Sequence, residues 1–340
     1  WAAGYTGAGS RIAVIDTGSD TDHQSLNSDA FQYSLAYRAG KSGMTIEEYA
    51  EYIDLLDAEE IAAVAGELNA PVGAEAYINA KIPFGYNYID GSLDVTHDND
   101  SQGSHGSHVA GIATANAYIP AEDGFVAAMD SALVQGVAPD AQLITMKVFG
   151  KAGGAYDSDY MAAIEDAIIL GCDVVNLSMG TTMPGSPYTK TFDYLMELME
   201  TTDTVVVISA GNASNWPVAS TFGYLYHDDV SFDTVGAPGS YANAFTVASV
   251  DNDGSVGDYF TVGEQKVFFG ETSGYGNTPF AGLDSSPNLT GTAYDYIYLD
   301  GLGYAEEYSG IDVSGKIVFV SRGTLNFAEK ANIALSRGAA

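Results

Sequence analysis

Residues 11–23 read RIAVIDTGSDTDH. The run from Arg11 to Ile15 is apolar, rich in β-branched residues and bounded by Gly9 and Gly18, a pattern typical of a strand buried on both faces. Asp16 follows it directly. The sequence therefore predicts a carboxylate at the carboxyl end of a buried strand, where open parallel sheets gather their functional groups.

Similar apolar runs recur further along the chain. They span Gln142 to Val148, Val174 to Leu177, Thr204 to Ser209 and Phe245 to Val250. Helical stretches separate several of them, and such alternation argues for a parallel sheet with crossover helices. The predicted fold class is α/β.

One crossover helix, just before the Val174 run, is marked in detail. Asp157 or Ser158 can cap its start, and Gly171 can end it. Its apolar stripe, expected to pack on the sheet, consists of Met161, Ile164 and Ile168.

Residues 45–69 read as two short helices, because two pairs resemble capping boxes. The pairs are Thr45 with Glu48, and Asp57 with Glu60. We interpret residues 30–95, approximately, as a helical insert on the surface of a first domain that covers residues 1–255.

Residues 256–340 differ in composition and pattern: they contain many Gly, Tyr, Thr and Ser residues and short alternating runs, which indicate a β-rich unit. The expected elements are strands at Gln265 to Phe269, Tyr294 to Leu299 and Lys316 to Ser321, and a helix from Phe327 to Arg337. A strand and helix at the end of a chain normally need a following strand to close their layer. We therefore expect this second unit to be partial.

Composition narrows the function classes. Of the 340 residues, 12 are Lys or Arg and 45 are Asp or Glu, a formal net charge of −33 that repels nucleic acid and anionic lipid surfaces. The single Cys172 excludes an internal disulfide framework. The sequence contains no run of 18 apolar residues, so it predicts no membrane span. The segment at Trp1 lacks a signal-peptide pattern, so any leader is expected to be already removed.

Three polar residues stand at positions suited to chemistry. Asp16 ends the first strand, Asn212 follows the strand through Ser209, and His105 lies in GSHGSHVAGIATAN, where small residues let a helix begin close to its neighbours. An Asp that accepts from one ring nitrogen of a His fixes its tautomer and stabilises the imidazolium during turnover. Asp16 and His105 are thus candidates for the acid and base of a nucleophilic triad.

Five segments in order carry a family resemblance: RIAVIDTGSDTDH, HGSHVAGIATA, GVAPDAQLITMKVF, VVNLSMG and VVISAGN. They resemble the motifs of subtilisin-like serine peptidases over roughly residues 1–250. The resemblance implies a subtilisin-like parallel sheet flanked by helices, with Asp16 as orienting acid, His105 as general base and Asn212 as oxyanion donor. The residues that it implies for the substrate channel and the primary specificity pocket are Leu177, Ser178, Met179, Gly180, Ser209, Ala210 and Gly211.

The last segment, GKIVFVSRGTLNFAEKANIALSRGAA, resembles the start of a protease-associated domain. In the larger cell-surface members of the family, similar to lactocepin and the C5a peptidases, this module stands between the oxyanion Asn and the catalytic Ser. No GTSMA-like motif occurs in this sequence. The resemblance thus implies a secreted or cell-surface, bacterial serine endopeptidase that cleaves protein or peptide substrates, with its Ser on the part of the parent chain beyond Ala340. Residues 1–340 alone are expected to be inactive.

Other interpretations stay open at this stage. A degenerate, inactive peptidase domain could serve as a peptide-binding scaffold. A metal-dependent hydrolase could use Asp16, His105 and His108, although HGSH lacks the i, i+4 pair of the zinc motif, and we expect His108 to be a buried structural residue. No cofactor is expected to be required for catalysis. Structural calcium is conceivable at His97, Asp98 and Asp100 or at Asp251 to Gly254.

Overall fold

The computed structural model describes residues 1–97, 103–151, 153–181, 190–211, 235–250, 259–269 and 293–339. These residues form two compact units, Trp1–Ser249 and Val250–Ala340. In the described part of the chain, no helix is long and apolar enough to cross a membrane.

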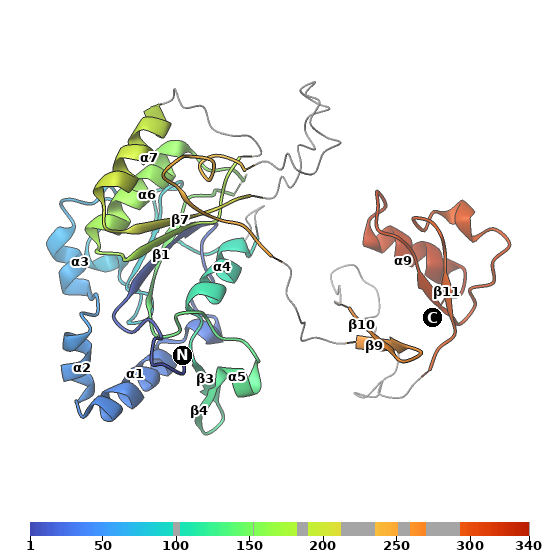
Figure 1. The fold of residues 1–340 in the computed structure, drawn as a ribbon, viewed down its shortest axis with the longest axis horizontal. Helices are drawn as coiled ribbons and strands as arrows, with labels where there is room; N and C mark the ends of the chain where they lie inside the picture. The colour runs from blue at the N-terminus through green and yellow to red at the C-terminus, as the bar shows by residue number, and fades with distance from the viewer. Residues whose placement is uncertain are drawn as a thin grey trace. The chain divides into compact units, whose positions relative to one another are not determined.

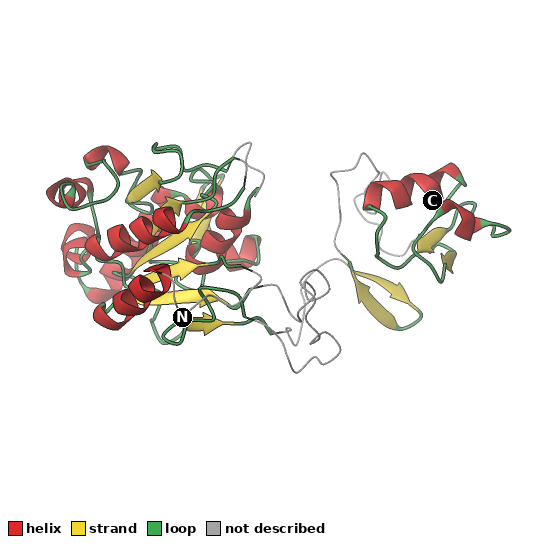
Figure 2. Cartoon of the chain, turned by 90° about the horizontal axis from the view of Figure 1, so that it is seen from above, coloured by secondary structure: helices red, strands yellow, loops and turns green. Residues whose placement is uncertain are grey.

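A six-stranded sheet forms the centre of the first unit (Figures 1 and 2). All its strand pairs are parallel, and the strand order is β2-β5-β1-β6-β7-β8. The strands are β1 (Arg11–Asp16), β2 (Phe84–Asn87), β5 (Gln142–Lys147), β6 (Val174–Leu177), β7 (Val205–Ser209) and β8 (Phe245–Val247). The predicted α/β class with a parallel sheet is confirmed.

Helices cover both faces of this sheet (Figure 1). The described helices of this unit are α1 (Ser28–Ser42), α2 (Ile46–Tyr52), α3 (Ala58–Val64), α4 (His105–Thr114), α5 (Ala128–Ser131), α6 (Asp157–Ile169) and α7 (Lys190–Thr201). The other elements among the described residues of this unit are two 3-10 turns, η1 (Gln24–Leu26) and η2 (Ala74–Ala76), and an antiparallel hairpin of β3 (Tyr118–Ala121) and β4 (Gly124–Ala127).

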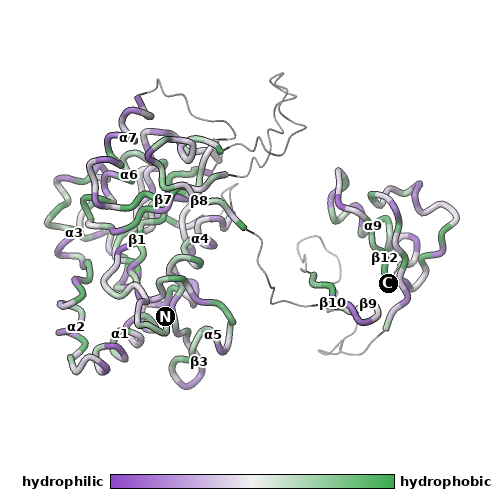
Figure 3. Tube along the Cα trace, viewed as in Figure 1, coloured by the Kyte–Doolittle hydropathy of each residue, from purple (hydrophilic) through white to green (hydrophobic). Residues whose placement is uncertain are grey.

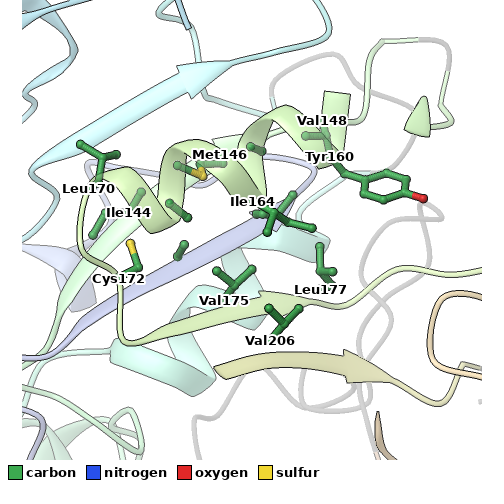
Figure 4. Close-up of a cluster of buried hydrophobic side chains, with 14 of the residues drawn as sticks. Ile144, Met146, Val148, Tyr160, Ile164, Leu170, Cys172, Val175, Leu177 and Val206 are labelled. Atoms are coloured by element: carbon green, nitrogen blue, oxygen red, sulfur yellow. The ribbon is translucent and has the colours of Figure 1, made fainter. Parts of the chain in front are cut away.

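Strand β1 is buried on both faces, as the apolar run predicts. Val14 packs with Ala110 of α4 on one face, whereas Ala13 and Ile15 join the larger core under α6 on the other. Figure 4 shows this larger core, which contains Ile164 of α6, Val175 and Leu177 of β6 and Val206 of β7. In Figure 3 the short strand β7, at the core, is coloured mainly as hydrophobic.

The expected insert at residues 30–95 contains one strand of the main sheet. Both predicted capping boxes are present, at the starts of α2 and α3, so the two short helices are confirmed, and the insert itself stays an interpretation. Strand β2, however, pairs with β5, and all four of its residues are buried. It escapes the pattern because it is short and contains Gly85 and Asn87, which have low strand propensity.

The predicted cap of α6 is wrong, although the helix itself is present. Its N-cap is Tyr156, which makes no side-chain capping bond. The carboxylate of Asp157 instead accepts from the hydroxyls of Tyr160 and Thr191. Gly171 follows the helix with a φ of 69°, in agreement with the predicted stop.

The second unit contains two small sheets. Strands β9 (Tyr259–Val262) and β10 (Gln265–Phe268) form an antiparallel hairpin, and β11 (Tyr296–Tyr298) pairs in parallel with β12 (Ile317–Phe319). The 3-10 turn η5 (Ala305–Tyr308) and helix α9 (Phe327–Ser336) accompany the parallel pair. A small core of Leu299, Tyr308 and Val313 lies among these elements.

Candidate active site

Asp16 and His105 meet where β1 ends and α4 begins. The Nδ1 atom of His105 lies 2.8 Å from Oδ1 of Asp16. The Asp16 side chain is 1% exposed, whereas that of His105 is 51% exposed. A buried carboxylate therefore holds one ring nitrogen of a histidine whose imidazole remains accessible from solvent.

Thr17 ties the strand end to the helix start. Its amide donates to Oδ1 of Asp16 at 2.7 Å, and its hydroxyl accepts from the amide of Gly106 at 2.9 Å. The other carboxylate oxygen of Asp16 is buried without a hydrogen-bond partner among the described residues. Thr17 was not among the predicted site residues; its position directly after a strand-end Asp is the signal in the sequence that could have found it.

Gly106 allows α4 to lie directly against the strand end. A Cβ atom at this position would lie 2.2 Å from the carbonyl oxygen of Gly18 and 3.1 Å from Cβ of Asp16. The first contact is shorter than real Cβ atoms make, and the second is tighter than most of them make, so any larger residue would push the helix away. The short distance between Asp16 and His105 thus depends on the absence of a side chain at residue 106.

The other predicted site residues lie at neighbouring strand ends. Ile15 pairs with Leu177, and Leu177 pairs with Ile208, so β1, β6 and β7 end at the same edge of the sheet. The hydroxyl of Ser209 donates to the carbonyl of Met179 at 3.4 Å, which connects the two loops that follow β6 and β7. The structure therefore brings Leu177 to Gly180 beside Ser209 to Gly211, where two adjacent strands end.

The model of the subtilase family matches residues 7–333. The chain belongs to the subtilase family. The order of its motifs, its parallel sheet and the pairing of Asp16 with His105 agree with this assignment.

Bacterial proteases are similar to this subtilase over nearly its whole length. The PII-type proteinase of Lacticaseibacillus paracasei is 30% identical over 348 residues, which cover 99% of this chain and 16% of that protein. The C5a peptidase of Streptococcus pyogenes serotype M3 is 28% identical over 341 residues, which cover 98% of this chain and 25% of that protein. The minor extracellular protease Vpr of Bacillus subtilis is 26% identical over 350 residues, which cover 100% of this chain and 31% of that protein. The subtilase segment thus spans less than a third of each of these relatives.

Some predicted site residues of this subtilase fall outside the described residues. Asn212 is one of them, as are Asp98, Asp100 and the stretch from Asp251 to Gly254. The oxyanion role and the calcium sites therefore stay predictions. Within the described ranges, no three His, Cys, Asp or Glu side chains gather in a group that could hold a metal.

His108 is exposed, so the expectation that it is buried is wrong. The buried face of α4 consists of Gly106, Ala110 and Thr114, four residues apart. His108 lies two residues from both Gly106 and Ala110, which places it on the opposite side of a helix with 3.6 residues per turn. The helical period alone would have predicted this exposure.

Proposed function

We propose that this subtilase is part of a secreted or cell-surface serine endopeptidase, and that Asp16 and His105 are two members of its catalytic triad. The hydrogen bond between the buried Asp16 carboxylate and the half-exposed imidazole of His105 carries the proposal. The third member, a Ser, is assigned to the part of the parent chain beyond Ala340. The relatives, which include an extracellular protease and a C5a peptidase, support this class of activity and location.

The reaction then follows from the orientation of the imidazole. A carboxylate can only accept, so Nδ1 of His105 carries the proton in the bond to Asp16, and Nε2 is left as the base. Nε2 takes the proton of the Ser hydroxyl as its oxygen attacks the peptide carbonyl, and returns that proton to the leaving amine. Water then hydrolyses the acyl-enzyme by the same route. Asp16 remains ionised and stabilises the imidazolium.

Substrate and oxyanion contacts are assigned to the neighbouring strand ends. Leu177 to Gly180 would form one edge of the channel, and Ser209 to Gly211 a wall of the pocket for the residue before the scissile bond. Asn212 would donate to the oxygen that becomes negative in the transition state. Such a channel suits an extended segment of a protein or peptide substrate.

The test is hydrolysis of casein by the full-length protein and three variants. His105→Ala and Asp16→Asn should lower kcat strongly, because the Ser hydroxyl is a weak nucleophile without a correctly oriented base. His108→Ala is the matched control: it removes an exposed histidine three residues further along the same helix and should leave kcat within about twofold of the unmutated value. Activity that survives His105→Ala would contradict the proposal, and an unmutated protein without activity would favour a peptide-binding scaffold.

A further inference from the structure

A buried lysine lies beside the Asp16–His105 pair and takes no part in the triad chemistry. Lys147 is the last residue of β5, is 2% exposed, and is the register partner of Asp16 on β1. Partners in a parallel ladder project to the same face of the sheet. Lys147 and Asp16 therefore share the face that α4 covers.

The Lys147 side chain supports the turn that follows Asp16. Its Nζ donates to the carbonyl oxygen of Thr17 at 2.6 Å. Its Cδ atom lies 3.3 Å from the place that a Cβ of Gly18 would occupy, so its methylenes pack under this turn. The whole side chain thus lies beneath the Thr17-Gly18 peptide, with its charged end at the Thr17 carbonyl.

Burial of this ammonium costs free energy that an apolar residue would not cost. Removing a lysine charge from water is unfavourable by several kcal/mol unless bonds and opposite charges offset it. Asp94 supplies one such charge: the hydroxyl and the amide of Thr96 and, as a smaller cause, the charge of Lys147 lower the pKa of its carboxyl. A methionine at residue 147 would fill a similar volume without the free-energy cost of burying a charge.

Thr17 transmits this support to both members of the pair. Its amide donates to the Asp16 carboxylate, and its hydroxyl joins the first turn of α4 by accepting from Gly106 and donating to the carbonyl of Gly103 at 3.3 Å. Its carbonyl is the group that Lys147 holds. Every polar atom of Thr17 is thus engaged, and its position is fixed from below by Lys147.

We propose that Lys147 is a positioning residue of the peptidase, which acts through Thr17 to hold the Asp16 carboxylate and the start of α4 in the geometry that orients His105. The inference rests on the proposed function. Small displacements at a reacting centre cost about 100-fold per ångström in rate. Loss of the Lys147 contact should therefore slow the acylation step while leaving the substrate channel, built from other strand ends, unchanged.

The experiment compares Lys147→Met with Lys81→Met in the full-length protein. Lys81 is the matched control because it is equally buried and also donates to backbone carbonyls, those of Pro139 and Ala141, at the opposite end of β5. The readouts are kcat and KM on a peptide substrate, and both the rate constant and the final extent of labelling by a fluorophosphonate.

For Lys147→Met we expect a loss of about 10- to 100-fold in kcat and in the labelling rate constant, with KM and the final extent of labelling unchanged. For Lys81→Met, kcat and the labelling rate should stay within about twofold. An unchanged labelling rate with fewer molecules labelled would indicate a purely structural role for Lys147 and would overturn the inference.

Two further variants keep the test decisive. If Lys147→Met does not fold, Thr17→Ala replaces it, since it removes the hydroxyl contacts to α4 and should slow labelling in the same way. His105→Ala separates the two proposals. If the protein is inactive, or its activity is indifferent to His105→Ala, the proposed function fails; if His105→Ala is inactive and Lys147→Met is fully active, only the role of Lys147 fails.

Discussion

At the scale of single residues, we expect opposite effects from alanine substitution at Gly106 and at Gly111 of α4. Gly106→Ala should lower kcat at least tenfold, because its Cβ would collide with the Gly18 carbonyl and move His105 away from Asp16. At Gly111 no atom lies within 4 Å of the corresponding Cβ. Gly111→Ala should therefore keep kcat and stabilise the helix by about 0.5–1 kcal/mol. Kinetics and thermal unfolding of both variants check this pair, and equal effects on kcat would contradict it.

Lys81 predicts a specific dependence of stability on pH. Burial lowers its pKa to about 7, against a weaker opposing effect of Asp140. Between about pH 7 and 10.5 the unfolded chain binds more protons at this lysine than the folded chain does, so its contribution to stability rises with pH there. Below pH 7 both states are protonated, and the contribution is constant.

Comparison with Lys81→Met measures this contribution. From pH 7 to 9, the free energy of unfolding of the unmutated protein should rise relative to the variant by about 1 kcal/mol per pH unit. Chemical denaturation at several pH values, kept below the range where tyrosines ionise, gives the difference. A constant difference across this range would show that Lys81 is not depressed in pKa.

At the scale of elements, one buried carboxylate joins the insert to the crossover helix. Asp166 of α6 is fully buried and accepts from the amides of Asn69 and Ala70 and from the hydroxyl of Tyr88. Asp166→Ala would leave these donors buried without an acceptor, so it should destabilise the protein by about 3 kcal/mol or more. Hydrogen exchange should show faster opening around residue 69. Glu67→Ala, at an exposed position nearby, is the control and should change stability by less than about 0.5 kcal/mol.

The elements that the sequence predicted correctly are those with strong local signals. Strands β1, β5, β6 and β7 are apolar runs with flanking turns, and the capping boxes at Thr45 and Asp57 depend on residues three apart. The errors arose where tertiary contacts decide. Strand β2 is held by its pairing with β5 and not by its own propensity, and the Asp157 carboxylate is drawn from a capping role by the hydroxyl of Thr191.

The residues of the candidate site likewise include some that local sequence patterns predict and one that only tertiary contacts reveal. Asp16 and His105 could be predicted because each stands in a recognisable local pattern, and the structure brings them together. Lys147 could not be predicted, since a lysine near the end of an apolar run reads as the point where a strand emerges into solvent. Its burial becomes evident only from the register that pairs it with Asp16.

At the scale of the whole molecule, the net charge of −33 predicts a salt-dependent choice of substrates. A strongly negative surface attracts cationic peptides and repels anionic ones, and salt screens both effects. Raising NaCl from about 0.05 to 0.5 M should therefore lower kcat/KM for a lysine-flanked peptide severalfold and raise it for a glutamate-flanked peptide of the same core sequence. The same salt response for both peptides would contradict the prediction.

The central claim, that Asp16 and His105 activate a serine nucleophile, is tested most directly by the rate at which a fluorophosphonate labels the full-length protein. We predict that one Ser per molecule is labelled, that peptide mass spectrometry maps it outside residues 1–340, and that labelling slows in both variants of the pair. The expected factors are about a millionfold for His105→Ala and about ten-thousandfold for Asp16→Asn, magnitudes that come from subtilisin itself, a member of this family. Labelling of a Ser within residues 1–340, or a rate indifferent to both substitutions, would contradict the account.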